Sequence, residues 1–132
     1  MKAVYICRTP PFYFIKIESI MTQPIASITI SGESERRYTF KTYPINVKDI
    51  GDISVVYIFA RRFKKDGKFL QKPLYVGESG QFQTRLNSHN KFEEVRRLGA
   101  NVVNIYEISG ESQRLQVETD LRHSLNCPCN EQ

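Results

Sequence analysis

The sequence lacks any apolar run that approaches the roughly 20 residues of a membrane-spanning helix, so we expect no membrane association. It has only three cysteines among its 132 residues, which is too few for a disulfide scaffold and favours a reducing, cytoplasmic location. Two of them, Cys127 and Cys129, supply only half of the four ligands that zinc usually takes. We therefore predict that these two are reduced structural thiols.

The first 25 residues also lack a clean hydrophobic period, and they carry Pro10-Pro11 among several aromatic residues. Lys16 and Glu18 interrupt the apolar residues and no small-residue cleavage site follows, so the stretch does not resemble a signal peptide. We expect residues 1–25 to form a loosely attached extension, with Met21 as a candidate for the true start. Residues 26–132 are predicted to form a single domain.

Periodicity predicts β-structure in the first half of that domain. Residues 26–43 are typical of a hairpin around Gly32-Glu33-Ser34, and residues 53–60 are the strongest strand, rich in β-branched and aromatic side chains. Asp66-Gly67 indicates a second turn, followed by a strand at residues 74–76. The later elements are predicted to be helices at 81–89, 91–99 and 111–125 and a strand at 101–108. This order predicts a small α/β (α+β) domain, a mostly antiparallel sheet flanked by helices.

Positive charge is concentrated in one segment. The chain carries +5 overall, and residues 61–72 alone carry +5, so the remainder is near neutral. The bases of this segment are Arg61, Arg62, Lys64, Lys65, Lys68 and Lys72. We interpret them either as a DNA-backbone contact or as a solvated hairpin tip, with about equal weight.

Glu118 is the most informative polar residue of the predicted last helix. The buried side of that helix is predicted to run through Leu115, Leu121 and Leu125. A carboxylate on this side must be paired, hydrogen-bonded or metal-bound. The ordinary interpretation is an ion pair with Arg114, four residues earlier, and the alternative is a Mg²⁺ ligand.

Six residues, each of which has an ordinary structural interpretation on its own, together form a recognisable sequence pattern. Alone, Tyr57 and Tyr75 would be core tyrosines, and Arg85 with His89 would be a solvated stripe on one helix face. Together with Val55-Val56-Tyr57 and Tyr75-Val76-Gly77, the pattern resembles the GIY-YIG nuclease domain over about residues 53–132. The positions that match the family are Tyr57, Tyr75, Arg85, His89, Glu118 and Asn130.

The preceding hairpin and the ending Cys127-Pro128-Cys129-Asn130 make the chain similar to small stand-alone bacterial members of that family. The resemblance implies hydrolysis of DNA phosphodiesters with Mg²⁺ (or Mn²⁺) held by Glu118. It implies that Arg85 holds a phosphate oxygen, that one of the two tyrosines takes the proton from water, and that His89 relays that proton or orients a tyrosine. Asn130 would brace the metal ligand.

Two positions depart from the family pattern. Val55 stands where the family usually has glycine, and Glu78 follows the second motif where many members have lysine. These departures keep two alternatives open: a nucleic-acid-binding module of the same fold without turnover, and a protein-interaction domain. Specificity is expected to be weak or to come from a targeting partner protein.

Overall fold

The computed structural model describes residues 4–6 and 23–130. They form a six-stranded antiparallel sheet in the order β1-β5-β4-β6-β3-β2, with three α-helices, so the predicted mixed α/β class is confirmed. The strands are β1 (Tyr5–Ile6), β2 (Ala26–Ser31), β3 (Arg37–Pro44), β4 (Val55–Lys65), β5 (Lys68–Ser79) and β6 (Val102–Glu107). The helices are α1 (Phe82–Asn87), α2 (Phe92–Arg97) and α3 (Glu111–Leu125), followed by the 3₁₀ turn η2 (Pro128–Asn130).

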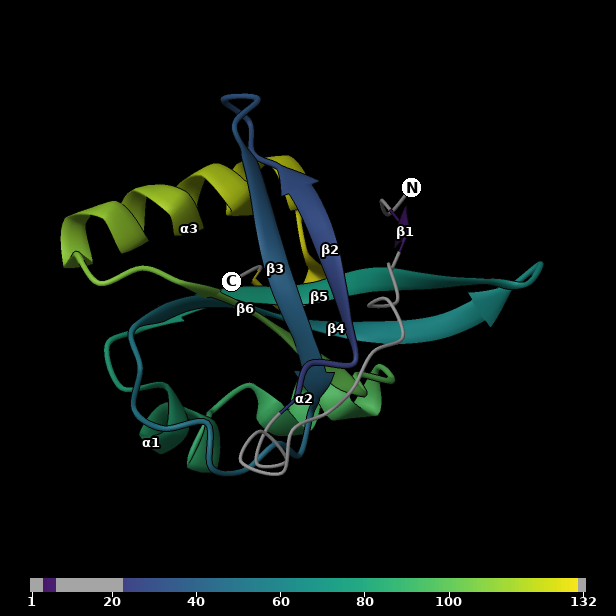
Figure 1. Ribbon diagram of the computed structural model, residues 1–132, viewed down its shortest axis with the longest axis horizontal. Helices are drawn as coiled ribbons and strands as arrows, with labels where there is room; N and C mark the ends of the chain where they lie inside the picture. The colour runs from purple at the N-terminus through teal and green to yellow at the C-terminus, as the bar shows by residue number, and fades with distance from the viewer. Residues whose placement is uncertain (1–3, 7–22, 131–132) are drawn as a thin grey trace.

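The sheet separates two hydrophobic cores. Helix α3 packs on one face, and α1 with α2 covers part of the other (Figure 1). The central strand β4 contributes to both, because successive side chains of a strand point to opposite faces. This explains why residues 55–60 are uniformly buried and read as a continuous apolar run rather than an alternating one. The β4 side chains are divided into Val56 and Ile58 on the α3 face and Val55, Tyr57 and Phe59 on the other.

Strands β4 and β5 are much longer than the predicted strands at 53–60 and 74–76. They pair to their ends at Lys65 and Lys68, and only Asp66 and Gly67 form the turn, both with positive φ (52° and 76°). The prediction of a basic turn at 61–72 is therefore corrected: its cations lie on paired strands. Strand β6 pairs with β4 only as far as Ala60, so residues 61–72, here named the basic arm, project from the sheet as a β4–β5 ribbon that the short strand β1 joins at Leu70 and Gln71 (Figure 1).

The buried side of α3 differs from the leucine pattern. Leu121 and Leu125 are buried as predicted, but Leu115 is 45% exposed, so that prediction is wrong. The buried side runs through Arg114 and Val117 instead. Arg114, Val117 and Leu121 follow one another at spacings of three and four residues, which is as regular as the leucine spacing. This pattern was missed because an arginine does not count as an apolar residue.

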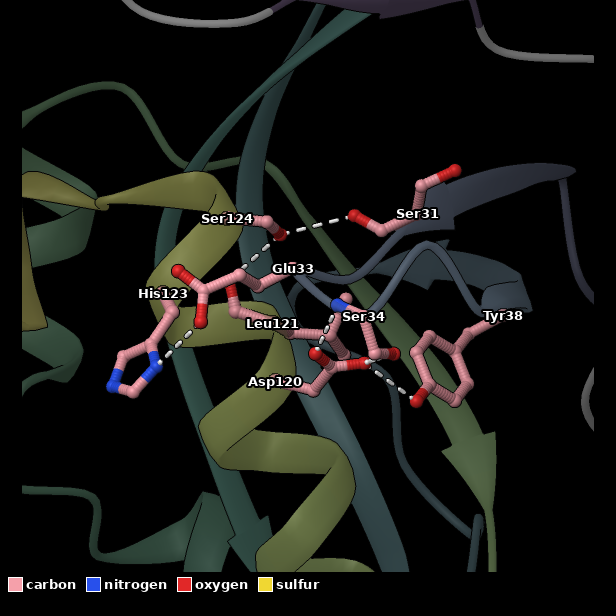
Figure 2. Close-up of polar contacts among 8 residues, drawn as sticks. All are labelled: Ser31, Glu33, Ser34, Tyr38, Asp120, Leu121, His123 and Ser124. Carbon is pink, nitrogen blue, oxygen red and sulfur yellow. Dashed lines mark hydrogen bonds and ion pairs between the residues drawn. The ribbon is translucent and has the colours of Figure 1, made fainter.

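The predicted hairpin at 26–43 is present as β2 and β3 and is fastened to α3. The carboxylate of Asp120 accepts hydrogen bonds from the Ser34 backbone N–H (2.8 Å), the Ser34 hydroxyl (2.7 Å) and the Tyr38 hydroxyl (2.8 Å) (Figure 2). A side chain at Gly32 would collide with that carboxylate. The hairpin therefore extends the sheet and positions α3 against it.

Most of the predicted extension 1–25 lies outside the described residues, at 1–3 and 7–22. The part that is described includes Tyr5–Ile6, which pairs with β5 at Leu70 and Gln71. Within residues 4–6 and 23–130, no helix is long and apolar enough to cross a membrane.

Candidate active site

The phenol of Tyr57 lies across the backbone of the neighbouring strand. Tyr57 on β4 stands directly opposite Gly77 on β5, and its side chain is almost fully buried. A Cβ at Gly77 would lie 2.5 Å from both Cζ and Oη of Tyr57 and 2.9 Å from the Tyr75 ring. Such approaches are too close for real carbon atoms, so only glycine leaves room for this phenol. The segments Val55-Val56-Tyr57 and Tyr75-Val76-Gly77 are therefore in contact through Tyr57, which packs on Gly77.

His89 holds the Tyr57 hydroxyl and has a defined tautomer. Its Nε2 lies 2.6 Å from Tyr57 Oη, and its Nδ1 accepts the backbone N–H of Lys91 at 3.0 Å. In the neutral ring the proton is therefore on Nε2, which donates to the phenol oxygen. Burial, followed by the charges of Arg85 and Lys91, lowers the His89 pKa to about 4, so the ring is neutral at neutral pH.

Arg85, from α1, lies beside both tyrosines. Its guanidinium donates to Asn90 Oδ1 at 3.4 Å and lies close enough to Tyr57 and Tyr75 to interact electrostatically with both, and the arginine is otherwise exposed. The two phenol rings are 6.3 Å apart, centroid to centroid, and His89 stands edge-on to the Tyr75 ring at 5.2 Å. Burial raises the pKa of Tyr57, and the contact with Arg85 opposes that rise.

Glu118 approaches the same group from the other face of the sheet. It is half-buried on α3, which packs on the face of the sheet opposite to the Tyr57 side chain, and its charge is the smallest of the named influences on the Tyr57 pKa. Burial raises the pKa of Glu118; Arg122 opposes this effect and Glu78 adds to it. Among the described residues, no hydrogen bond or ion pair engages the Glu118 carboxylate, and the expected pair with Arg114 is not formed.

Arg114 pairs with Glu78 instead. The Nε of this buried arginine is 3.0 Å from Glu78 Oε1, and its Nη1 donates to the Ser109 carbonyl at 2.8 Å. Glu78, one of the two departures from the resembled family's pattern, is thus paired with the arginine that was expected to pair with Glu118. The burial of Arg114 could have been predicted from its position three residues before Val117, on the same inward face of the helix.

Asn130 is bonded to the strand that carries Tyr75 and Gly77, not to Glu118. Its Oδ1 accepts the Val76 backbone N–H and its Nδ2 donates to the Val76 carbonyl, both at 2.8 Å. The side-chain amide thereby satisfies the backbone N–H and C=O of Val76 on the outer edge of β5, where no further strand of the described residues pairs at this position. The amide fixes the main chain between the second tyrosine and the glycine.

Val55, the other departure, is fully buried in the core that also contains Tyr57. Its side chain therefore packs within the core below the phenol. The six bases Arg61, Arg62, Lys64, Lys65, Lys68 and Lys72 all lie on the basic arm, which leaves the sheet three residues beyond Tyr57.

Oxygen donors at the site fit a hard cation better than a soft one. Within residues 4–6 and 23–130, no three His, Cys, Asp or Glu residues cluster closely enough to hold a metal by themselves. Mg²⁺ often takes only one or two carboxylates and completes its shell with water and substrate phosphate, so a single carboxylate such as Glu118 is compatible with it. Cys127 and Cys129 are buried, and burial, followed by the charge of Glu94, raises the Cys129 pKa to about 11.

Comparison of the chain with family models, curated proteins and solved structures finds no match. Function must therefore be argued from the residues. The structure brings Tyr57, Tyr75 and His89 together, places Arg85 and Glu118 within electrostatic range of Tyr57, and bonds Asn130 to the strand that carries Tyr75.

Proposed function

We propose that the protein is a Mg²⁺-dependent endonuclease that hydrolyses phosphodiester bonds in DNA. The observation that carries the proposal is that the charges of an exposed arginine and a half-buried carboxylate both act on a buried phenol that packs near a second phenol, the four groups coming from four separate elements. The Glu118 carboxylate forms no hydrogen bond or ion pair among the described residues, and its half-exposed position leaves it accessible to a cation.

Arg85 is suited to hold the scissile phosphate. Its planar fork donates to nonbridging phosphate oxygens, and its exposed position on α1 leaves it accessible to a strand. A divalent ion held by Glu118 would supply charge stabilisation for the phosphate and the departing oxygen. Removing either group is expected to slow cleavage about a hundredfold or more.

Tyr57 is the stronger candidate for the proton acceptor. Its oxygen accepts the Nε2–H of His89 and lies within range of the Arg85 charge, and both stabilise a phenolate. Because burial raises its pKa, the free protein holds the neutral phenol at neutral pH. A cation held by Glu118 would offset the negative charge of the phenolate and so favour loss of the proton. Tyr75 is less buried and lies beside the same arginine, where it can orient water or phosphate.

A nucleic-acid-binding module without turnover is the second candidate. The raised pKa values of Tyr57 and Glu118 both favour the neutral, non-catalytic forms. Under this alternative Arg85 and the basic arm bind DNA, and the cation has no effect on the integrity of the strand. The third interpretation, a protein-interaction domain, has no specific contact in its favour.

Cleavage of an end-labelled duplex with and without Mg²⁺ or Mn²⁺ separates these candidates. Wild type is expected to cut only with the cation, and Glu118→Gln to cut about a hundredfold more slowly or less. Glu111→Gln is the matched control, because Glu111 is exposed in the first turn of the same helix. Equal cutting by all three proteins would identify a contaminant and defeat the proposal.

A further inference from the structure

The basic arm has two chemically different faces. The register places Arg61 opposite Lys72, Phe63 opposite Leu70, and Lys65 opposite Lys68. Residues directly opposite in an antiparallel pair share a face, and so do alternate residues along β4, so this face continues the one that carries Tyr57 and Phe59. Arg61 packs against Gly99, just beyond α2, which confirms the side. We name it the site face of the arm.

Cations on the opposite face are engaged within the protein. The guanidinium of Arg62 lies 3.9 Å from the centroid of the Phe69 ring, and the Lys64 ammonium lies 5.7 Å from the same centroid. These cation–π contacts occupy both side chains and stabilise the ribbon. Asn101 adds two hydrogen bonds to the Arg62 backbone (2.7 and 2.9 Å) at the root of the arm. The arm is thus held in a defined direction.

The three lysines of the site face are not engaged in this way. Within the described part of the chain, no hydrogen bond, ion pair or ring contact involves Lys65, Lys68 or Lys72. Moreover, Lys65 faces Lys68 and Arg61 faces Lys72 directly, and like charges in directly opposed positions destabilise a ribbon. A polyanion lying along this face would turn that repulsion into attraction.

The length of the arm indicates how long a polyanion it can contact. Seven residues, one of them bulged, separate Tyr75 from Lys68 on β5, and six separate their partners Phe59 and Lys65 on β4, which at about 3.3 Å per residue is about 20–23 Å. At about 3.4 Å per base pair this equals about six to seven base pairs of duplex. Resting on the proposed function, we propose that the substrate is duplex DNA extending about six to seven base pairs or more to one side of the cut, with its backbone along Lys65, Lys68 and Lys72.

Binding measured in a Glu118→Gln background, without added divalent cation so that cutting is suppressed, tests the proposal. The site-face pair Lys65→Gln/Lys68→Gln is compared with the opposite-face pair Arg62→Gln/Lys64→Gln, since each removes two charges from the same ribbon. Duplex affinity is followed against salt concentration, and thermal unfolding verifies that each variant is folded. Two lost phosphate contacts lower the slope of log K against log salt by about 1.8, and we expect this only for the site-face pair.

Shortening the duplex from either end supplies the second readout. Affinity is expected to fall when one side of the cut is reduced below about six to seven base pairs, and to be insensitive to equal shortening of the other side. Equal slope changes for both pairs, or a symmetrical length dependence, would overturn the proposal even if wild type cuts DNA. Face-selective, asymmetric binding without cation-dependent cutting would support the arm and refute the nuclease.

Discussion

His89 Nε2 lies 2.6 Å from the hydroxyl oxygen of Tyr57, while the Lys91 backbone N–H occupies the other ring nitrogen. A histidine held in this way is a fixed donor, and the phenol that receives its proton has its own O–H free to point toward a ligand. The stability of the fold, the tautomer of His89 and the reactivity of Tyr57 therefore all depend on this one buried contact. The first two predictions follow from it.

Replacing Tyr57 with phenylalanine removes the acceptor for His89. Tyr57→Phe is expected to slow cleavage about a hundredfold or more and to lower the free energy of unfolding by about 1–3 kcal/mol, because a buried N–H loses its partner. Tyr75→Phe is the matched comparison: its ring is less buried, so a smaller loss of stability is expected. Single-turnover rates and urea unfolding measure both effects. A slower Tyr75→Phe enzyme would reassign the proton acceptor.

The low pKa of His89 predicts how stability depends on pH. The folded protein holds this pKa at about 4, below the usual 6.5, so between these values the unfolded chain binds the proton more readily. The stabilisation is present above about pH 6.5 and is lost as pH falls toward 4. Melting temperatures at pH 7 and pH 5 should therefore differ less in His89→Gln than in wild type. An unchanged difference would show that the ring does not titrate this way.

Gly77 should not tolerate a side chain. The Cβ of Gly77→Ala would meet Cζ and Oη of Tyr57 at 2.5 Å, so the phenol must move away from His89 and Arg85. Cleavage is expected to fall by about tenfold or more, since small displacements of catalytic groups are costly. Gly80→Ala is the control, because its Cβ would meet only Arg114 Nη2, at 3.4 Å. Equal activity of the two variants would argue against close packing of the phenol.

Arg114 and Glu78 should behave as a coupled pair. Arg114→Met leaves Glu78 without its cation and is expected to cost about 3 kcal/mol of stability, near the lower end for breaking a buried pair because the acid is 24% exposed. The double variant Arg114→Met/Glu78→Gln should recover part of this loss. A double-mutant cycle in urea provides the coupling energy. Additive losses would show that the ion pair contributes nothing specific.

Much of the fold was predictable because its signals are local. The Asp66-Gly67 turn, the apolar run of β4 and the leucines Leu121 and Leu125 all report directly on turn geometry and burial. The length of the arm was not predictable, because Lys and Arg on a two-stranded ribbon resemble a solvated loop when only composition is read. The exposure of Leu115 was missed for a related reason, since a buried arginine took its place.

The candidate site was predictable only in part. The order of the residues in the sequence indicated which of them could bind phosphate and metal, but it did not indicate which residues form hydrogen bonds and ion pairs with one another. Arg114 lies four residues from Glu118 in sequence yet pairs with Glu78 on β5, and Asn130 bonds to Val76 rather than to the acid. Both partners are fixed by the packing of α3 and η2 against the edge of the sheet, which no local pattern encodes.

A double-mutant cycle on the rate of Mg²⁺-dependent duplex cleavage tests most directly whether Tyr57 and Glu118 act on one phosphate. Single-turnover rates are measured for wild type, Tyr57→Phe, Glu118→Gln and the double variant. If the two groups act on one phosphate, the double variant will cut no more slowly than the slower single variant, since groups that act as a unit are strongly non-additive. Losses that multiply, or cleavage that neither change reduces, would contradict a shared centre.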